Sequence, residues 1–446
     1  MYTLYSWLTA AGMILLSPYF LVRGLANGKY LRNIVERLGW KFPAELKSGT
    51  DGSIWIHAVS VGEVLAALPL ATQLKQLFPQ RPLVVSTTTM TGQQLAHQRL
   101  RCADAIFYFP LDWSGPVTRA IKAARPAIVV IVETEIWPNF LRECRRAGVP
   151  VVFVNGRLSE RSHRGFLRAI RWSGGMLHGF LKRVLDDSSL FMMQSEPDAA
   201  RLLTLGADPE RVTVSGNLKY DMATPPETPL SAWLQKELAL RKSRPVLVAG
   251  SVMADEETQV LKAFADVQRD FPDALLILAP RKPDRFEAAA QAVIASGQTL
   301  VRRRDLTLNG AGNAALAEPG AVLLLDSLGE LADIYRLADA VFVGGSLVAT
   351  GGHNILEPAA FSRVPVYGPS MENFREMAGK FLEADAGIQV KDSEGLARAW
   401  KGLLGDPARA QRMGAAAREL VERNHGATSR VLTRIAGTLN SSRGRS

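Results

Sequence analysis

The sequence predicts an α/β fold of two doubly wound parallel sheets that face a cleft, preceded by an N-terminal membrane-anchor helix. Short apolar, β-branched runs alternate with helix-length segments along most of the 446 residues, which is the pattern of βαβ units. The run Ala127–Val132 is apolar at every position, as in a parallel strand covered on both faces. The alternation stops at the proline-rich stretch 224–229 and then begins again, so we expect two similar domains.

The expected strands are short apolar runs. In the first half they are Ser53–His57, Pro82–Thr87, Ile106–Phe109, Ala127–Val132, Pro150–Val154, Leu190–Met193 and Val212–Ser215. In the second half they are Pro245–Ala249, Ala274–Ala279, Ala321–Asp326, Ala340–Val343 and Val364–Tyr367. Helices are expected between strands, for example over Glu63–Phe78 and Pro138–Ala147. Because ligands of open α/β sheets bind beyond the carboxyl ends of strands, the residues that follow these runs are the site candidates.

Composition supports a folded protein. Hydrophobic residues make up 47% and charged residues 22% of the chain, which excludes a disordered chain, a collagen and a coiled coil. Two cysteines cannot build a disulfide framework, so a reducing compartment is expected. The formal charge of +10 attracts nucleic acid, anionic lipid or phosphorylated substrates without choosing among them. We expect an anchor helix at residues 1–22 and a basic juxtamembrane segment at 23–52. The first domain is expected at 53–223, a linker at 224–240 and the second domain at 241–430, followed by a polar tail at 431–446.

The first 22 residues carry no charge, and as a helix they would span about 33 Å, enough to cross a bilayer core. Aromatic residues lie near both ends, as in an interfacial belt. The basic residues that follow are Arg23, Lys29, Arg32, Arg37 and Lys41. The positive-inside rule therefore places the rest of the chain in the cytoplasm. Two alternatives stay open: a helix that packs on the protein, and a helix that lies in the membrane interface without crossing it.

A carboxylate, Glu63, follows the first expected strand. The pattern Ser60-x-x-Glu63 fits a capping box, in which the serine accepts from the backbone and the glutamate reaches back to it. Alternatively, Glu63 is a carboxylate at the mouth of the cleft, available as a general base.

Two more carboxylates, Glu133 and Glu135, follow the buried run Ala127–Val132. Carboxylates at the end of a buried strand are unfavourable unless they are paired or belong to a site. The alternative is that they are acids near the N-terminus of a helix that starts at Pro138, where the helix dipole favours them.

Five arginines follow the expected strand Pro150–Val154 with spacings that place them on one face of a helix. They are Arg157, Arg161, Arg164, Arg168 and Arg171. A solvated charged face is the usual explanation of such a row. Because Glu160 is the one acid among them, the row also suits the phosphates of a lipid or a membrane surface.

In the second half, basic and glycine-rich segments follow strands. Arg281 is placed to meet a phosphate. Glycine pairs stand at 344–345 and 351–352; glycines before a helix start let the backbone approach a phosphate, and the helix N-terminus adds free N–H groups. Glu357 is a candidate ligand of a ribose diol, although Asn354-x-x-Glu357 also fits a capping box.

Several motifs are absent. The sequence holds no G-x-x-x-x-G-K-[ST], G-x-G-x-x-G or G-x-S-x-G, which argues against P-loop, dinucleotide and hydrolase-elbow chemistry. It holds no D-x-D pair for a divalent metal, and its six histidines are scattered without zinc-ligand spacing. A reaction with a phosphate leaving group and no metal would rely on lysine and arginine.

Five segments together resemble the 3-deoxy-D-manno-octulosonic acid (Kdo) transferases of lipopolysaccharide and lipid A biosynthesis. They are Val59–Glu63, Glu133–Asn139, Arg157–Ser162, Gly216–Lys219 and the region Gly344–Glu357 with its Gly-Gly-Ser and Gly-His-Asn-x-Leu-Glu motifs. The likeness runs from the N-terminal segment to about residue 430, with the motifs in the expected order. Only their combination is specific.

The resemblance implies a GT-B glycosyltransferase with two Rossmann-like domains, of which the first binds the acceptor and the second the donor. The enzyme would be anchored at the cytoplasmic side of the Gram-negative inner membrane. Such enzymes transfer Kdo from CMP-Kdo to the 6′-hydroxyl of the lipid A precursor, lipid IVA, with inversion and without metal or another cofactor. The implied partners are CMP-Kdo, the lipid A precursor and anionic membrane lipid, with no nucleic acid.

The same resemblance assigns roles residue by residue. It implies that Glu63 is the general base and that Glu133 and Lys219 stabilise the transition state. CMP would be held by Pro280, Arg281, Leu328, Gly329, Glu330, Asn354, Ile355, Leu356 and Glu357. Leu328 and Ile355 are expected to act through their backbones. The arginine row would then meet the phosphates of the acceptor or of the membrane.

The expected role of Glu63 as a general base conflicts with its expected position at a helix N-terminus, because that position stabilises the charge of the carboxylate and makes it a weaker base. We expect closure or bound lipid to raise its pKa. Two other functions stay open: a membrane-associated GT-B enzyme with a UDP-sugar donor, and a non-catalytic basic scaffold that binds anionic lipid or RNA.

Overall fold

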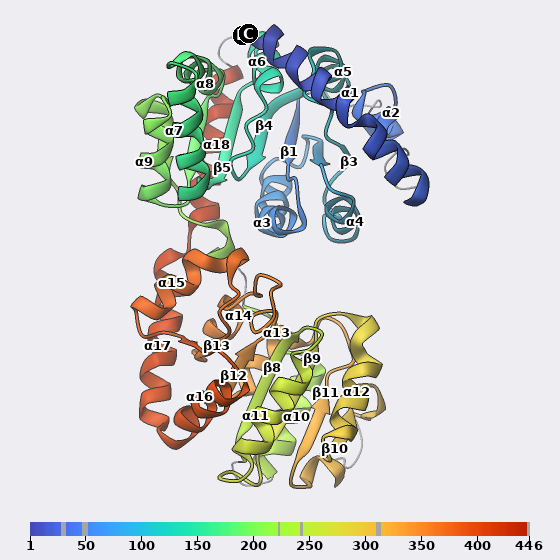
Figure 1. Cartoon of the computed structure of the whole chain (residues 1–446), viewed down its shortest axis with the longest axis vertical. Helices are drawn as coiled ribbons and strands as arrows, with labels where there is room; N and C mark the ends of the chain where they lie inside the picture. The colour runs from blue at the N-terminus through green and yellow to red at the C-terminus, as the bar shows by residue number, and fades with distance from the viewer. Residues whose placement is uncertain (28–32, 47–51, 222–223, 241–243, 309–313, 444–446) are drawn as a thin grey trace. The chain divides into compact units, whose positions relative to one another are not determined.

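The protein is described by a computed structural model over residues 1–27, 33–46, 52–221, 224–240, 244–308 and 314–443. The chain forms two compact units. The N-terminal unit consists of Met1–Met222 and Asn424–Ser446, and the C-terminal unit of Ala223–Arg423. Each unit contains its own seven-stranded sheet (Figure 1), so the expectation of two parallel α/β domains is confirmed. The cleft expected between them stays a prediction.

The sheet of the N-terminal unit is parallel throughout. Its strands are β1 (Ser53–His57), β2 (Leu83–Thr87), β3 (Ala105–Tyr108), β4 (Pro126–Val132), β5 (Val151–Gly156), β6 (Leu190–Met193) and β7 (Val212–Val214). All seven overlap the expected runs, with somewhat different ends; β5, for example, extends to Gly156, beyond the expected end at Val154. In the order β3-β2-β1-β4-β5-β6-β7, the direction of strand addition reverses between β1 and β4. This reversal is the topological switch point, where open α/β sheets bind their ligands.

Ten helices are described in this unit. They are α1 (Tyr2–Asn27), α2 (Ile34–Arg37), α3 (Val61–Leu77), α4 (Met90–Arg99), α5 (Ser114–Ala124), α6 (Pro138–Arg146), α7 (Glu160–Trp172), α8 (Met176–Asp186), α9 (Glu196–Thr204) and α18 (Ala427–Arg443). The helices expected over Glu63–Phe78 and Pro138–Ala147 are α3 and α6.

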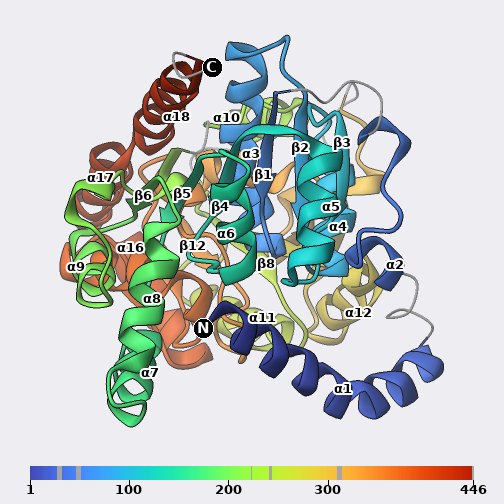
Figure 2. The same ribbon diagram turned by 90° about the horizontal axis from the view of Figure 1, so that it is seen from above.

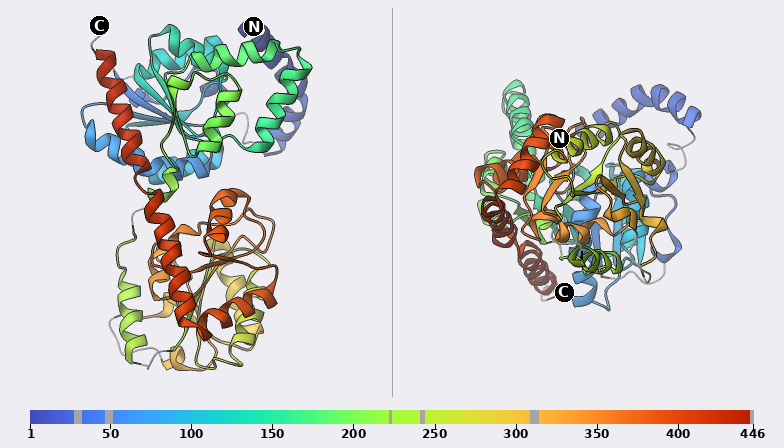
Figure 3. Two further views of the ribbon diagram at one scale, coloured as in Figure 1. Left: turned by 90° about the vertical axis from the view of Figure 1, so that its left-hand side faces the viewer. Right: turned by 90° about the horizontal axis from the view of Figure 1, so that it is seen from below.

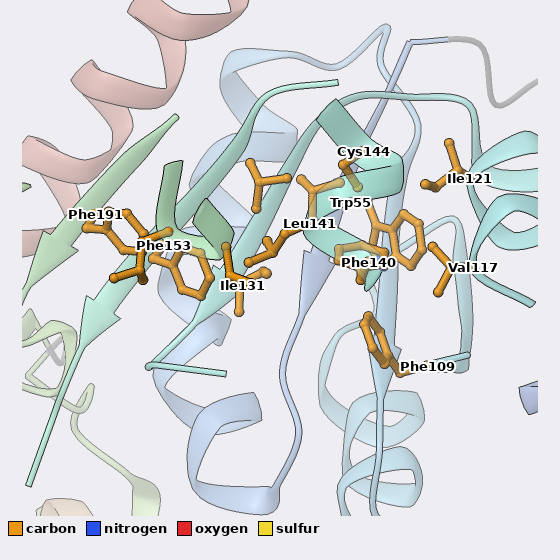
Figure 4. Packing of buried hydrophobic residues seen from close by; sticks show 14 of the residues in the cluster. Trp55, Phe109, Val117, Ile121, Ile131, Phe140, Leu141, Cys144, Phe153 and Phe191 are labelled. Atoms are coloured by element: carbon orange, nitrogen blue, oxygen red, sulfur yellow. The ribbon is translucent and has the colours of Figure 1, made fainter. Parts of the chain in front are cut away.

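An aromatic cluster fixes β1 and β4 against α5 and α6 (Figure 4). The Trp55 ring lies 5.2 Å from the rings of Phe107 and Phe140, and its indole N–H donates to Ser86 Oγ at 2.8 Å. Full burial of each large apolar side chain stabilises the fold by about 2–3 kcal/mol. The strands that carry the site residues are therefore anchored in a rigid core.

The sheet of the C-terminal unit is also parallel. Its strands are β8 (Val246–Val252), β9 (Leu275–Pro280), β10 (Thr299–Arg302), β11 (Ala321–Leu324), β12 (Ala340–Val343), β13 (Pro365–Tyr367) and β14 (Ile388–Gln389). The order β10-β11-β9-β8-β12-β13-β14 reverses between β8 and β12. The two edge strands were not predicted, because β10 runs into three arginines and β14 has two residues.

Eight helices are described in the C-terminal unit. They are α10 (Pro229–Leu240), α11 (Glu257–Val267), α12 (Phe286–Ala295), α13 (Leu331–Ile334), α14 (Leu356–Ala359), α15 (Arg375–Glu383), α16 (Ser393–Gly405) and α17 (Pro407–Asn424). Trp400 of α16 is fully buried and its indole N–H donates to the Val341 carbonyl at 3.2 Å, which ties this helix to β12.

Two expected boundaries differ from the structure. The polar tail expected at 431–446 is largely the helix α18, which buries Val431, Leu432, Ile435 and Leu439 in the core of the N-terminal unit. Their helical spacing was hidden among arginine, serine and threonine. The linker expected at 224–240 ends at Pro229, where α10 begins, and Trp233 and Leu234 of that helix are buried in the C-terminal unit.

The N-terminal helix α1 is attached to the N-terminal unit by its first three turns. The Tyr2 hydroxyl donates to the Asp187 carboxylate, and the Trp113 indole N–H donates to Thr9 Oγ1 at 3.2 Å. The expected alternative of a helix packed on the protein is thus confirmed for this part of α1. Within the described part of the chain, no helix meets the length and hydropathy needed to span a membrane.

Of the expected basic segment, Lys29 and Arg32 and the side chain of Arg23 lie outside the described residues. Arg37 is described, and its guanidinium donates to the Thr88 carbonyl. The guanidinium also lies 5.0 Å from the centre of the Tyr108 ring. Arg37 therefore attaches α2 to the sheet.

Candidate active site

Glu63 and Glu133 both lie at the switch point of the N-terminal sheet. Glu63 is in the first turn of α3, which follows β1, and Glu133 directly follows β4. β1 and β4 are paired neighbours, with His57 opposite Ile131. The sequence therefore places both carboxylates beyond the carboxyl ends of adjacent strands, where the fold rule expects a ligand.

The Glu63 carboxylate is held in place by two donors. Its Oε2 accepts from the Val59 N–H at 2.7 Å, and its Oε1 accepts from the Ser60 hydroxyl at 2.8 Å. Ser60 makes no side-chain cap to the backbone. The expected capping box is therefore half present: the glutamate reaches back to the backbone, but the serine hydroxyl is directed to the carboxylate.

Burial raises the pKa of Glu63 from 4.5 to about 7, since the side chain is 6% exposed and desolvation disfavours its charge. The hydrogen bond from Val59 lowers the pKa, the negative charge of Glu133 raises it, Ser60 lowers it, and Glu135 raises it. The chain by itself therefore raises the pKa of Glu63, because the effect of burial is larger than the stabilisation of the charge by the helix N-terminus. A carboxylate with a pKa near neutral pH suits a general base.

Glu133 and Asn155 hold strained backbone at the ends of β4 and β5, with φ of 62° and 56°. Residues with a Cβ rarely adopt this left-handed region, and such strain clusters at functional sites. The Glu133 N–H donates to the Val154 carbonyl at 2.9 Å. The buried Asn155 side chain accepts from the Leu218 N–H at 3.0 Å, so it positions the turn that carries Lys219.

Lys219 lies in a short 3₁₀ turn, Leu218–Asp221. Burial lowers the pKa of Lys219, Glu133 and Glu63 raise it, and Arg157 lowers it. The structure thus brings Glu63, Glu133 and Lys219 together, with Arg157 beside them. We call Glu63, Glu133 and Lys219 the carboxylate–lysine cluster.

The arginine row divides into two parts. Arg161, Arg164, Arg168 and Arg171 lie on α7 and are exposed. Arg157 precedes α7, and its N–H donates to Thr134 Oγ1 at 2.8 Å. The expectation of five arginines on one helix face is therefore wrong for Arg157, because the helix starts only after the cap at Ser159.

The turn between α7 and α8 exposes apolar side chains. Trp172 is 92% and Met176 65% exposed. Figures 2 and 3 show this hairpin and α1 on the same side of the N-terminal unit. On α1, Leu4, Trp7 and Leu8 are exposed, on the face away from the Tyr2 and Thr9 contacts. We call these exposed apolar residues of α1 and the α7–α8 turn, with the four arginines of α7, the apolar–basic surface.

In the C-terminal unit, the expected donor residues follow three strands of one sheet: the neighbours β9 and β11, and β12, which β8 separates from β9. Pro280 and Arg281 are at the end of β9, the segment 328–330 follows β11, and the segment 354–357 follows β12. Burial raises the pKa of Glu357, while Asn354 and Arg281 lower it. Arg281 therefore lies within electrostatic reach of Glu357 at one edge of the sheet.

His353 belongs to the same group. Burial and, to a smaller extent, the positive charge of Arg281 together lower the pKa of His353 to about 4. The Asn354 amide donates to Glu357 Oε1 at 3.4 Å, and its carbonyl accepts from the Leu356 N–H at 3.1 Å. The capping-box alternative is thus partly present. The helix that follows, α14, has four residues, so it contributes little of the expected dipole.

The first glycine pair of this unit does not present free amides. The fully buried Glu256 carboxylate accepts from the N–H groups of Gly345, Ser346 and Leu347 at 2.6, 2.8 and 2.8 Å. The expectation that these amides bind a phosphate is corrected: a carboxylate of the same chain occupies them. The N–H groups of the second glycine pair are also paired within the chain: Gly351 donates to Ser370 Oγ at 3.0 Å and Gly352 to the Gly345 carbonyl at 2.7 Å.

Glu330 is also paired within the chain. Its carboxylate accepts from the Arg303 guanidinium at 2.8 Å and from the Ser327 hydroxyl. Leu328 is 73% exposed, and Gly329 has a φ of 87°. Gly329 therefore turns the backbone of this segment at the carboxyl edge of the sheet.

A cavity of about 710 Å³ lies at the amino ends of the strands of the C-terminal sheet, opposite the expected donor residues. Its lining includes Arg244, Asp339, Arg363 and Leu403. None of the expected site residues lines it. Within the described part of the chain, no three His, Cys, Asp or Glu side chains come together as a metal site.

Three residues with a role at these edges were missed from the sequence: Asn155, Glu256 and Arg303. Glu256 follows a buried strand as Glu133 does, so the rule that selected Glu133 would also have found it. Asn155 directly follows the expected strand Pro150–Val154, so the same rule would have included it. Arg303 carries no comparable signal, because its partner Glu330 is distant in sequence.

Known proteins similar to this chain place it in a family. The family model described as 3-deoxy-D-manno-octulosonic-acid transferase (kdotransferase) matches residues 32–222. A 3-deoxy-D-manno-octulosonic acid transferase of Haemophilus influenzae is 33% identical over 411 residues, which cover 91% of each chain. The chain belongs to the Kdo transferase family. It is an enzyme, and the alternative of a non-catalytic scaffold is excluded.

Further comparisons agree. A Kdo transferase of Bordetella pertussis is 34% identical over 411 residues, 89% of each chain. A crystal structure of a glycosyltransferase from Rickettsia africae matches with a TM-score of 0.53 at 12% identity, over 88% of this chain and 99% of that chain. The latter supports only the fold, which for this Kdo transferase is α/β and GT-B-like.

Proposed function

We propose that this Kdo transferase moves Kdo from CMP-Kdo to the 6′-hydroxyl of the lipid A precursor, with inversion and without metal. The observation that carries the proposal is the carboxylate–lysine cluster, with Glu63 buried at the switch point and its pKa raised to about 7. Hydroxyl attack needs a base that is deprotonated at neutral pH and still accepts a proton.

In the proposed step, the acceptor oxygen bonds to C2 of Kdo while the bond from C2 to the CMP phosphate breaks. The hydroxyl proton passes to Glu63, and CMP leaves with the bonding electrons. The Glu133 carboxylate would stabilise the positive charge that develops on the sugar, and the Lys219 ammonium would stabilise the negative charge that develops on the departing phosphate. The backbone at each residue is held before reaction, at Glu133 by the hydrogen bond to the Val154 carbonyl and at Lys219 by the turn that bonds to Asn155.

The donor is proposed to bind the carboxyl edge of the C-terminal sheet. Arg281 is the cation for the CMP phosphate, and Glu357 accepts from the ribose hydroxyls. Because Arg303 holds the Glu330 carboxylate, we expect segment 328–330 to contact CMP through its backbone. Pro280, Asn354, Ile355 and Leu356 complete the proposed set.

The apolar–basic surface is proposed to bind the anionic cytoplasmic leaflet of the Gram-negative inner membrane. Its arginines suit lipid phosphates, and Trp172 and Trp7 are of the type that inserts at headgroup depth. A helix with one face docked on protein and an apolar face outside suits the interface better than a span. This favours the alternative in which α1 lies in the membrane interface.

The first test is Kdo transfer to lipid IVA, with CMP-Kdo generated in situ, EDTA present and products read by mass. Wild type, Glu63→Gln and the exposed control Glu160→Gln are compared. We expect product from wild type and the control, and a loss of about 10²–10⁴-fold for Glu63→Gln, which is the usual contribution of general base catalysis. Full activity of Glu63→Gln would remove the proposed base.

Donor choice is tested separately by binding CMP and UDP to the wild type and to Arg281→Gln. The proposal expects CMP to bind and Arg281→Gln to weaken that binding. Preference for UDP would support the alternative of a UDP-sugar enzyme.

A further inference from the structure

The inward face of α1 bonds to residues at the start of α6. The Asn139 side-chain amide donates to Ser6 Oγ at 3.0 Å, and the Tyr5 hydroxyl is hydrogen-bonded to the Asp112 carboxylate. Ser6 and Tyr5 are partly buried. These are specific polar contacts, whereas an anchor helix needs only apolar surface.

Asp112 caps the start of α6, and Asn139 in the first turn of that helix bonds back to Asp112. The Asp112 carboxylate accepts from the N–H groups of Asn139 at 3.2 Å and Phe140 at 2.8 Å, which are among the backbone donors that a helix start leaves unpaired. Asn139 is fully buried, and its amide also donates to the Asp112 carbonyl at 2.6 Å. The inward face of α1 thus contacts both Asp112, which caps α6, and Asn139 in its first turn.

The start of α6 is also the end of a segment of the candidate active site. α6 begins at Pro138, directly after the segment Glu133–Trp137, whose other end is fixed by β4. Glu133 and Glu135 from this segment raise the pKa of Glu63. The position of the segment therefore affects both a member of the carboxylate–lysine cluster and the electrostatics of the base.

We propose that the inward face of α1 positions the segment Glu133–Trp137, so that this helix sets the rate of the reaction as well as holding the protein at the membrane. The two faces of α1 then have separate tasks: Tyr5 and Ser6 on one side support the site, and Leu4, Trp7 and Leu8 on the other meet lipid. This inference rests on the proposed function of Glu63 and Glu133.

The test uses the full chain with the double change Tyr5→Phe and Ser6→Ala, which leaves the lipid-facing side chains intact. We expect kcat for detergent-dispersed lipid IVA to fall about tenfold, because small displacements of catalytic groups cost up to about 10²-fold. KM for CMP-Kdo and binding to anionic vesicles stay unchanged. The pH midpoint of kcat falls, because Glu133 and Glu135 move away from Glu63 while Lys219 stays on its own turn.

Two controls separate positioning from folding and anchoring. The single change Ser6→Thr keeps the hydroxyl and should retain wild-type kcat. Thr3→Ala changes an exposed hydroxyl of the same turn and should alter neither kcat nor the pH midpoint. Thermal unfolding shows whether the double variant is folded; if it is not, Ser6→Ala alone, which removes the contact with Asn139, replaces it.

The outcomes distinguish the two proposals. A folded double variant with wild-type kcat and pH midpoint overturns the positioning role of α1 and leaves the role of Glu63 intact. An active Glu63→Gln overturns the proposed base, whatever the double variant does. A fall in kcat with an unchanged pH midpoint also contradicts positioning of Glu133 and Glu135.

Discussion

At the scale of single residues, Glu63 combines a helix N-terminus, which favours its charge, with burial and two neighbouring carboxylates, which disfavour it. The disfavouring influences win, and its pKa rises to about 7. Since a general base acts when deprotonated, we expect kcat/KM to rise with pH and level off above about pH 7. Glu133→Gln removes a like charge and should shift this midpoint to lower pH. A pH profile of both proteins measures the shift; an unchanged midpoint contradicts the coupling.

The same raised pKa has a consequence for stability. An acid whose pKa is higher in the folded than in the unfolded chain destabilises the fold once it ionises, so the effect is absent below pH 4.5, grows between pH 4.5 and 7, and is complete above it. Glu63→Gln should therefore raise the free energy of unfolding at pH 8 by up to about 3 kcal/mol, while transfer activity is lost. Denaturant titrations at pH 8 and pH 4 test this, with the gain expected only at pH 8.

At the scale of elements, the α7–α8 hairpin carries four exposed arginines and an exposed Trp172 at its turn. Each arginine near an anionic surface contributes about 1 kcal/mol, screened by salt. Replacing the four arginines of α7 by glutamine should weaken binding to anionic vesicles by about 10²-fold or more at low salt. Co-sedimentation with vesicles that contain about 30% anionic lipid, and with neutral vesicles, measures this loss of binding.

The matched control replaces Arg418 and Arg423 of α17, which are exposed and paired with Glu422 and Glu419. That change should leave vesicle binding near the wild-type level. Trp172→Ala should weaken binding at high salt as well, because its contribution is apolar. Equal losses in the α17 control would show that net charge, and not the hairpin, controls binding.

At the scale of the whole molecule, the elements that follow from local pattern were predictable and the long-range contacts were not. Strands such as β4 stand out because a parallel strand buried on both faces needs apolar residues throughout. Glu63 and Glu133 were found because strand ends at a sheet carry function. Their closeness to Lys219 was implied only by family resemblance. That Glu256 would fill the amides after β12 depends on tertiary packing, which no spacing within the sequence encodes.

The return of the chain to the N-terminal unit leads to a prediction for the whole molecule. α18 buries Val431, Leu432, Ile435 and Leu439, which together contribute about 6–12 kcal/mol, as much as the entire stability of a typical domain. Asp221 fixes its start by accepting from the Gly426 N–H at 2.6 Å. Ending the chain after His425 should therefore unfold the N-terminal unit, although its sheet is intact in sequence.

The control ends the chain after Asn440, beyond the last of these four buried residues, and should unfold at nearly the wild-type temperature. Thermal unfolding followed by circular dichroism and tryptophan fluorescence distinguishes the two truncations, because Trp55 lies in the N-terminal core and Trp400 in the C-terminal one. A chain ending after His425 that retains wild-type melting would mean that α18 is an appendage, as its polar composition indicates. Loss of the N-terminal transition alone would instead show that the last helix of the chain is a structural part of the unit that contains Glu63.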